Sequence, residues 1–160
     1  MALLIDGPRS RYTLQETDKG ISVVATAEIP RRMTIMEEKP LFILEQHELR
    51  PKKLPKKLID GTMVDGKVFK AGLPWQIVVQ DKRQQLSRIH RAVFDNLAYS
   101  PNILSAADRK KIPLRSDIMM KTSMRFRSNA MECGSGTGDM GIFPTCSRLN
   151  HSCMPNAQFT

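Results

Sequence analysis

The spacing of apolar residues changes along the chain, and this change constrains the fold more than any other feature of the sequence. Between residues 11 and 44, four short segments are rich in β-branched or apolar residues: Tyr12–Gln15, Ile21–Thr26, Thr34–Met36 and Leu41–Leu44. The sequence Thr-Asp-Lys-Gly at 17–20 is typical of a turn between the first two. Pro40 indicates a strand edge or a break. Residues 11–44 are therefore predicted to form a small β module.

Helical spacing replaces this pattern further along. Residues 45–75 are rich in Pro, Gly and Lys and predict a loop or linker, whereas Leu86, Ile89, Val93 and Leu97 recur at the period of a helix over 76–97. On that helix we interpret His90 as a partly buried structural histidine.

Two further helix starts are predicted downstream. Ser105 stands three residues before Asp108, as a helix N-cap does, and Ser116 or Asp117 starts another helix. Its methionines at 119, 120 and 124 are interpreted as core residues.

A glycine-rich segment, Cys133–Gly141, lies between two short apolar stretches. It has no lysine followed by Ser or Thr after the last glycine, which a phosphate-binding loop requires. We therefore predict a hairpin connection there.

The charge of the chain is concentrated in its middle. The 160 residues include 25 Lys plus Arg and 16 Asp plus Glu, a net charge of +9, and residues 45–127 alone carry +10. The densest run is Arg50–Lys57. Such a run suits nucleic acid, an acidic protein surface or a nuclear localisation signal, but it is also common in solvated loops. Aromatic residues make up 6%, which does not favour a stacking platform for single strands.

Composition also narrows the compartment. Hydrophobic residues make up 41%, enough for a packed core, and no apolar run approaches the roughly 18 to 20 residues of a membrane span. The N-terminus lacks the basic region of a secretory signal. Three cysteines are too few for a disulfide framework. We expect a soluble intracellular protein, in the nucleus or cytoplasm, with no membrane partner.

Residues 147–156 concentrate amide, imidazole, hydroxyl and thiol groups, and three chemistries are open. Cys153 could act as a thiolate nucleophile with His151 as its base, although no partner for the imidazole is evident. Cys133, Cys146, His151 and Cys153 could bind zinc, although their spacing does not match paired C-x2-C sites. Alternatively, the asparagines could hold a polar small molecule, because an amide both donates and accepts hydrogen bonds.

The order of these residues is more specific than their composition. Residues 148–156 fit the pattern R-x-x-N-H-S-C-x-P-N, except that only Leu149 separates Arg148 from Asn150. The string resembles the knotted motif of the SET-domain protein-lysine methyltransferases. Other segments resemble the same family, in particular its SMYD-like branch and related fungal proteins: Lys19–Thr26 with Glu28–Pro30, Thr34–Leu41, Asn129, Gly141–Pro144 and Ser147–Leu149. The resemblance covers residues 11–44 and 124–160, and the basic insert stands where the family has a variable helical region.

The resemblance implies an S-adenosylmethionine site. Its cofactor-binding residues would be Lys19, Gly20, Ile21, Asn129, Asn150 and His151. The first three match a loop that contacts the cofactor through its backbone, although Ser22 stands where the family usually has a second glycine. Asn129 would line the pocket. Asn150 would act through its side chain and His151 largely through its backbone, on the methionine part and the adenine.

Cys153 matches one ligand of a three-cysteine zinc cluster whose other ligands are absent, so the resemblance implies zinc only in a full-length form. The family continues into a G-E-E-x-x-x-x-Y-like segment whose tyrosine lines the lysine channel. That catalytic tyrosine is expected beyond Thr160, since Tyr12 and Tyr99 lie in no comparable motif. We expect either a fragment, inactive as given, or a degenerate module.

The expected fold is therefore α+β, a SET-like β-clip of short sheets with a helical insert, incomplete at its C-terminus. After a tail at 1–10, residues 11–160 would form a partial domain, divided into a β module at 11–44, a basic insert at 45–127 and a cofactor-motif segment at 128–160. The expected activity is methylation of protein lysine, on a histone or another protein. The alternative is a non-catalytic module whose basic insert binds nucleic acid or an acidic protein.

Overall fold

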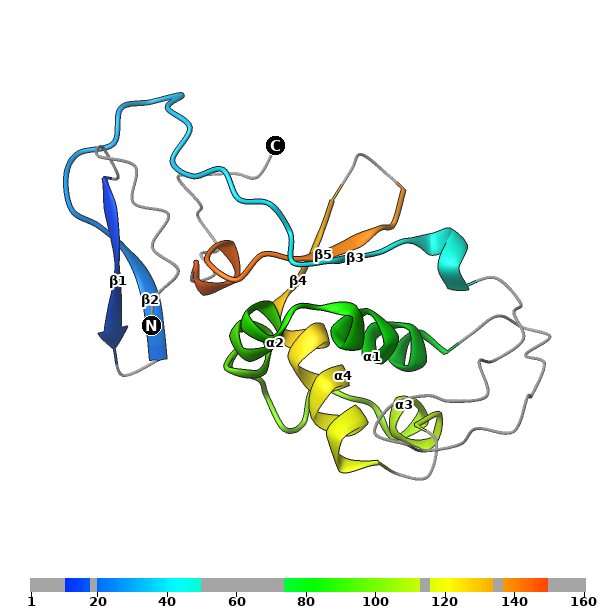
Figure 1. The fold of residues 1–160 in the computed structure, drawn as a ribbon. Coiled ribbons are helices and arrows are strands. Elements are labelled where there is room, and N and C mark those ends of the chain that lie inside the picture. Colours follow the sequence, from blue (N-terminus) through cyan, green and yellow to red (C-terminus); the bar gives the residue numbers. More distant parts are fainter. Residues whose placement is uncertain (1–10, 18–19, 50–73, 113–115, 134–136, 150–160) are drawn as a thin grey trace. The chain divides into compact units, whose positions relative to one another are not determined.

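The computed structural model describes residues 11–17, 20–49, 74–112, 116–133 and 137–149 (Figure 1). In these residues the fold is mixed α and β, with small antiparallel sheets and four α-helices. The elements are, in order, β1 (Tyr12–Thr17), β2 (Gly20–Ala25), β3 (Ile43–Leu44), η1 (Gln46–Leu49), α1 (Trp75–Gln85), α2 (Arg88–Asp95), α3 (Ala106–Lys110), α4 (Asp117–Asn129), β4 (Ala130–Glu132), β5 (Met140–Ile142) and η3 (Cys146–Arg148). None of the helices described is long and apolar enough to cross a membrane.

The chain divides into two compact units. Unit 1 combines Met1–Lys39 with Thr145–Thr160, and unit 2 comprises Pro40–Pro144. Unit 1 is therefore built from two segments that are far apart in the sequence. Both hydrophobic core clusters found in the described residues belong to unit 2.

The predicted hairpin of unit 1 is confirmed. Strands β1 and β2 pair antiparallel from Tyr12 opposite Ala25 to Thr17 opposite Gly20. The strand predicted at Thr34–Met36 is wrong, because these residues lie outside any described strand. A turn precedes them, in which Arg32 has a positive φ of 65°. The following segment is held by contacts of its side chains rather than by a strand ladder, as described below.

The sheet of unit 2 has the order β3-β5-β4, and both of its pairings are antiparallel. The strand predicted at Leu41–Leu44 is shorter than expected, although Leu41 N–H still donates to the Ile142 carbonyl at 2.8 Å. Cys133 N–H donates to the Asp139 carbonyl at 3.0 Å and extends the β4–β5 pairing. The hairpin connection predicted for Cys133–Gly141 is thereby confirmed.

The helix predicted over 76–97 is two helices. Leu86 is extended, and the Ser87 hydroxyl accepts a hydrogen bond from His90 N–H, so a new N-cap interrupts the first helix. Leu97, at the end of the predicted apolar stripe, is buried in the core, whereas Ile89 in the middle of the stripe is 58% exposed. His90 is exposed as well, so its interpretation as a partly buried residue is wrong.

The main core of unit 2 lies between its sheet and its helices, which are seen below the strands in Figure 1. It comprises Phe42, Leu44, Val78, Val79, Phe94, Leu97, Phe126 and Ile142. A second cluster contains Met119 and Met124, which confirms the predicted role of the methionines. The predicted caps are also confirmed, because the Ser105 and Ser116 hydroxyls accept from Asp108 N–H and Met119 N–H.

Candidate functional site

Unit 1 contains two elements, β2 and η3, that are adjacent in sequence to the segments predicted to bind the cofactor. The short helix η3 packs against β2, although they are separated by more than a hundred residues. Strand β2 begins with Gly20 and Ile21, and η3 is followed within two residues by Asn150. Four of the predicted site residues, Lys19, Asn150, His151 and Cys153, lie outside the described residues. The structure describes the elements next to them in the sequence, namely β2 after Lys19 and η3 before Asn150.

Near the start of β2, one residue is exposed and the next is buried. Ile21 is 48% exposed, so an apolar side chain faces solvent beside the backbone of Gly20. Ser22 is only 4% exposed, and its hydroxyl lies 3.2 Å from the hydroxyl of Thr17. Where the resemblance leads one to expect glycine, a hydroxyl side chain occupies the buried face of the strand.

The carboxylate of Glu38 binds the backbone at the start of η3. Thr145 N–H lies 3.0 Å from each of the two carboxylate oxygens, and Cys146 N–H donates to Oε2 at 2.9 Å. The sequence carries no signal that Glu38 binds the backbone of Thr145 and Cys146. The contact joins residues that are more than a hundred positions apart, and the segment Thr34–Leu41 had been singled out only for its family resemblance.

Cys146 is held in its thiol form. Its sulfur lies 3.4 Å from the sulfur of Met36, and burial together with the negative charge of Glu38 raises the pKa of the thiol to about 12. A thiol must lose its proton to act as a nucleophile or a zinc ligand. Cys146 is therefore poorly suited to either role at neutral pH.

The described residues do not fit a zinc site. Cys133 belongs to unit 2, where burial raises the pKa of its thiol, and its sulfur lies 3.6 Å from the Asp139 carbonyl oxygen. In the described part of the chain, no three His, Cys, Asp or Glu side chains are close enough to hold a metal ion. The hypotheses that involve His151 and Cys153 lie outside the described residues.

Asn129 has a structural role in unit 2. It is the last residue of α4 and is 9% exposed. Its Nδ2 donates to the carbonyl of Ala98 at 2.7 Å and to that of Arg125 at 2.8 Å. Both amide hydrogens are thus used: one joins the end of α4 to the segment after α2, and the other bonds within α4. A ligand could interact with this side chain only through its oxygen.

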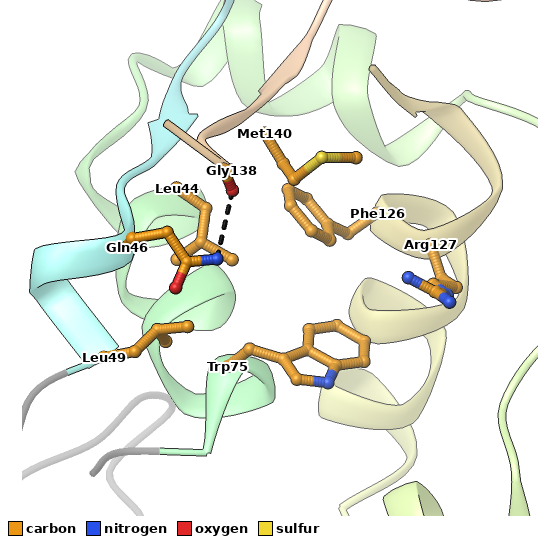
Figure 2. Close-up of a pocket in the computed structure, with 8 residues that line it drawn as sticks. All are labelled: Leu44, Gln46, Leu49, Trp75, Phe126, Arg127, Gly138 and Met140. Carbon is orange, nitrogen blue, oxygen red and sulfur yellow. Dashed lines mark hydrogen bonds between the residues drawn. The ribbon is translucent and has the colours of Figure 1, made fainter. Parts of the chain in front are cut away.

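Unit 2 also contains an open pocket of about 170 Å³, shown in Figure 2. Its walls are mostly apolar, and the lining includes Leu44, Leu49, Trp75, Phe126 and Met140. On one side Gln46 Nε2 donates to the Gly138 carbonyl at 3.2 Å. Among the described residues that line this pocket, Arg127 is the only charged one.

The basic insert is neutralised in part by its own fold. Arg83 makes a bidentate contact with Asp95, with distances of 2.8 and 2.6 Å, and Lys82 lies 2.7 Å from Glu48. Arg91 and Arg109 donate to main-chain carbonyls. These side chains support the helices rather than form a free basic surface. The run Arg50–Lys57 lies outside the described residues.

Comparison with known proteins gives no match to this chain among family models, curated proteins or solved structures.

Proposed function

We propose that this chain contains the cofactor-binding part of a SET-like protein-lysine methyltransferase and binds S-adenosylmethionine. The observation that carries the proposal is the packing of η3 against β2 in unit 1. The motif resemblance requires the loop at Lys19–Ile21 and the pair Asn150–His151 to serve one ligand. Packing between the elements adjacent to these two segments is what such a shared site needs.

The residues divide the recognition of the cofactor between them. We assign the backbone of Gly20 and Ile21 to contact with the ligand, since glycine carries no side chain and Ile21 is 48% exposed. The Asn150 amide can donate to a carboxylate or accept from an amine, and it would hold the methionine part. His151 would contribute mainly its backbone groups. The bound cofactor supplies the methyl group on a sulfonium, for transfer to a neutral lysine amine of a protein.

Two of the residues implied by the resemblance receive smaller roles. The amide hydrogens of Asn129 are already used within unit 2, so we assign it a structural role there. Cys153 is proposed as a zinc ligand only together with further cysteines, because one thiolate does not complete a tetrahedral site. No step of the proposed reaction uses zinc.

Calorimetric titration with S-adenosylhomocysteine tests the proposal directly. The proposal concerns the binding of the cofactor, so binding rather than turnover is measured. We expect saturable binding that weakens at least tenfold in Asn150→Ala, whereas Asn102→Ala, an equivalent change in an exposed turn of unit 2, leaves it unchanged. A folded chain that shows no binding at millimolar ligand would contradict the proposal.

A further inference from the structure

Every backbone hydrogen-bonding group of Thr145, the N-cap of η3, and of Cys146, its first residue, has a partner. The carbonyls of Thr145 and Cys146 accept from Arg148 N–H and Leu149 N–H, both at 3.0 Å. Their own N–H groups, which a helix start leaves without a partner inside the helix, donate to Glu38. The chain is therefore held in a defined direction up to Leu149, the residue that immediately precedes Asn150.

Glu38 acts together with Met36, two positions earlier. Residues 33–40 belong to no described helix or strand, and the side chains of both Met36 and Glu38 contact the start of η3. Met36 contacts the Cys146 sulfur, while Glu38 binds the amides of Thr145 and Cys146. The segment therefore fastens η3 through two side chains.

A carboxylate is specifically suited to this position. Its oxygens are acceptors only, and the bonds they receive from N–H groups are strengthened by the negative charge. Glutamine has nearly the same shape, but it replaces one oxygen by an NH₂ group. Since Thr145 N–H lies at equal distances from both oxygens, glutamine would place a donor against a donor.

We propose that Glu38 is a positioning residue of the cofactor site, because it holds the start of η3, the element that leads into Asn150. This inference rests on the function proposed above. Glu38 acts through the backbone of η3 and need not touch the cofactor. Its loss should therefore weaken cofactor binding through Asn150.

The test compares Glu38→Gln with Glu37→Gln, which makes the same change of charge at the exposed neighbouring residue. In titrations with S-adenosylhomocysteine we expect Glu38→Gln to weaken binding at least tenfold and Glu37→Gln less than twofold. Hydrogen exchange measured by mass spectrometry should be faster in the peptide that contains Thr145 and Cys146 only in Glu38→Gln.

A double-mutant cycle separates positioning from general destabilisation. If Glu38 acts through Asn150, adding Glu38→Gln to Asn150→Ala weakens binding less than twofold further, whereas a general loss of structure would reduce affinity equally in both backgrounds. If Glu38→Gln does not fold, Glu38→Asp takes its place, since it retains the charge but shortens the reach by one methylene.

Three results overturn the inference. A folded Glu38→Gln, or Glu38→Asp in its place, that binds the ligand as tightly as the wild type would refute it while leaving the proposed function intact. Equal losses in both arms of the cycle would also refute it alone. A folded wild-type chain without any binding would instead remove the proposed function, and the positioning role with it.

Discussion

Replacement of Asn129 by alanine should destabilise unit 2 by about 2 kcal/mol. The side chain donates two hydrogen bonds to main-chain carbonyls, those of Ala98 and Arg125, in a position that is 9% exposed. A typical intramolecular hydrogen bond contributes about 1 kcal/mol net, so the loss of two such bonds gives about 2 kcal/mol. The loss at Ala98 is the more serious, because its bond joins α4 to a different segment of the chain.

Trp75 provides the signal for this measurement. It is the only tryptophan in the chain, and its ring lies 5.8 Å from the ring of Phe126 in the core of unit 2. Unfolding in urea, followed by Trp75 fluorescence, therefore reports on unit 2 itself. With a urea dependence of about 2 kcal/mol per molar, typical of small domains, the midpoint should fall by about 1 M.

Two variants make the result interpretable. Asn129→Asp retains the size of the side chain but cannot donate to either carbonyl, so it should lower the midpoint at least as much as Asn129→Ala. Asn102→Ala, in an exposed turn, should change it by less than about 0.3 M. A midpoint for Asn129→Ala equal to that of the wild type would refute the structural role of Asn129.

Three further predictions concern other contacts. Gly138→Ala should lower the melting temperature, at a cost of about 1–2 kcal/mol, because φ is +72° and the added Cβ would lie 3.0 Å from Gln46 Nε2; wild-type melting would contradict this. Asp95→Asn should cost about 1 kcal/mol in urea unfolding, since Arg83 loses a partly exposed charged partner, and an unchanged midpoint would show that the pair contributes nothing. Iodoacetamide should label Cys146 at least tenfold more slowly than a free thiol at pH 8, because its pKa is about 12, and stability should fall as pH rises from about 9 towards 12, where only the unfolded thiol ionises. Equal labelling rates by peptide mass spectrometry would refute the protected thiol.

The features that could be predicted from the sequence are local ones. The β1–β2 hairpin follows from two β-rich segments around a turn sequence, and the caps at Ser105 and Ser116 need only the few residues that follow them. The mixed α and β character follows from the same local patterns. Apolar spacing was misleading where a local cap overrode it, as Ser87 does between α1 and α2.

The contacts of Glu38 and Asn129 join residues that are far apart in the sequence. Glu38 meets Thr145 and Cys146 across more than a hundred residues, and Asn129 meets Ala98 across 31. Glu38 lies in a run of charged residues and Asn129 lies at the end of a helix. Nothing in the sequence distinguishes a structural contact of either side chain from a contact with a ligand. The family resemblance singled out Asn129 but did not reveal which partners its amide has.

The order β3-β5-β4 has a consequence for how unit 2 folds. The pairing of β4 with β5 closes a short loop, whereas the pairing of β3 with β5 must bring together residues from opposite ends of the unit. Closing a long loop costs more conformational entropy and slows the formation of such contacts. We therefore expect the helices and the β4–β5 hairpin to assemble first, with β3 joining last. Phe42 and Leu44 lie in and next to β3, so this part of the core should form last in folding and be lost first in unfolding.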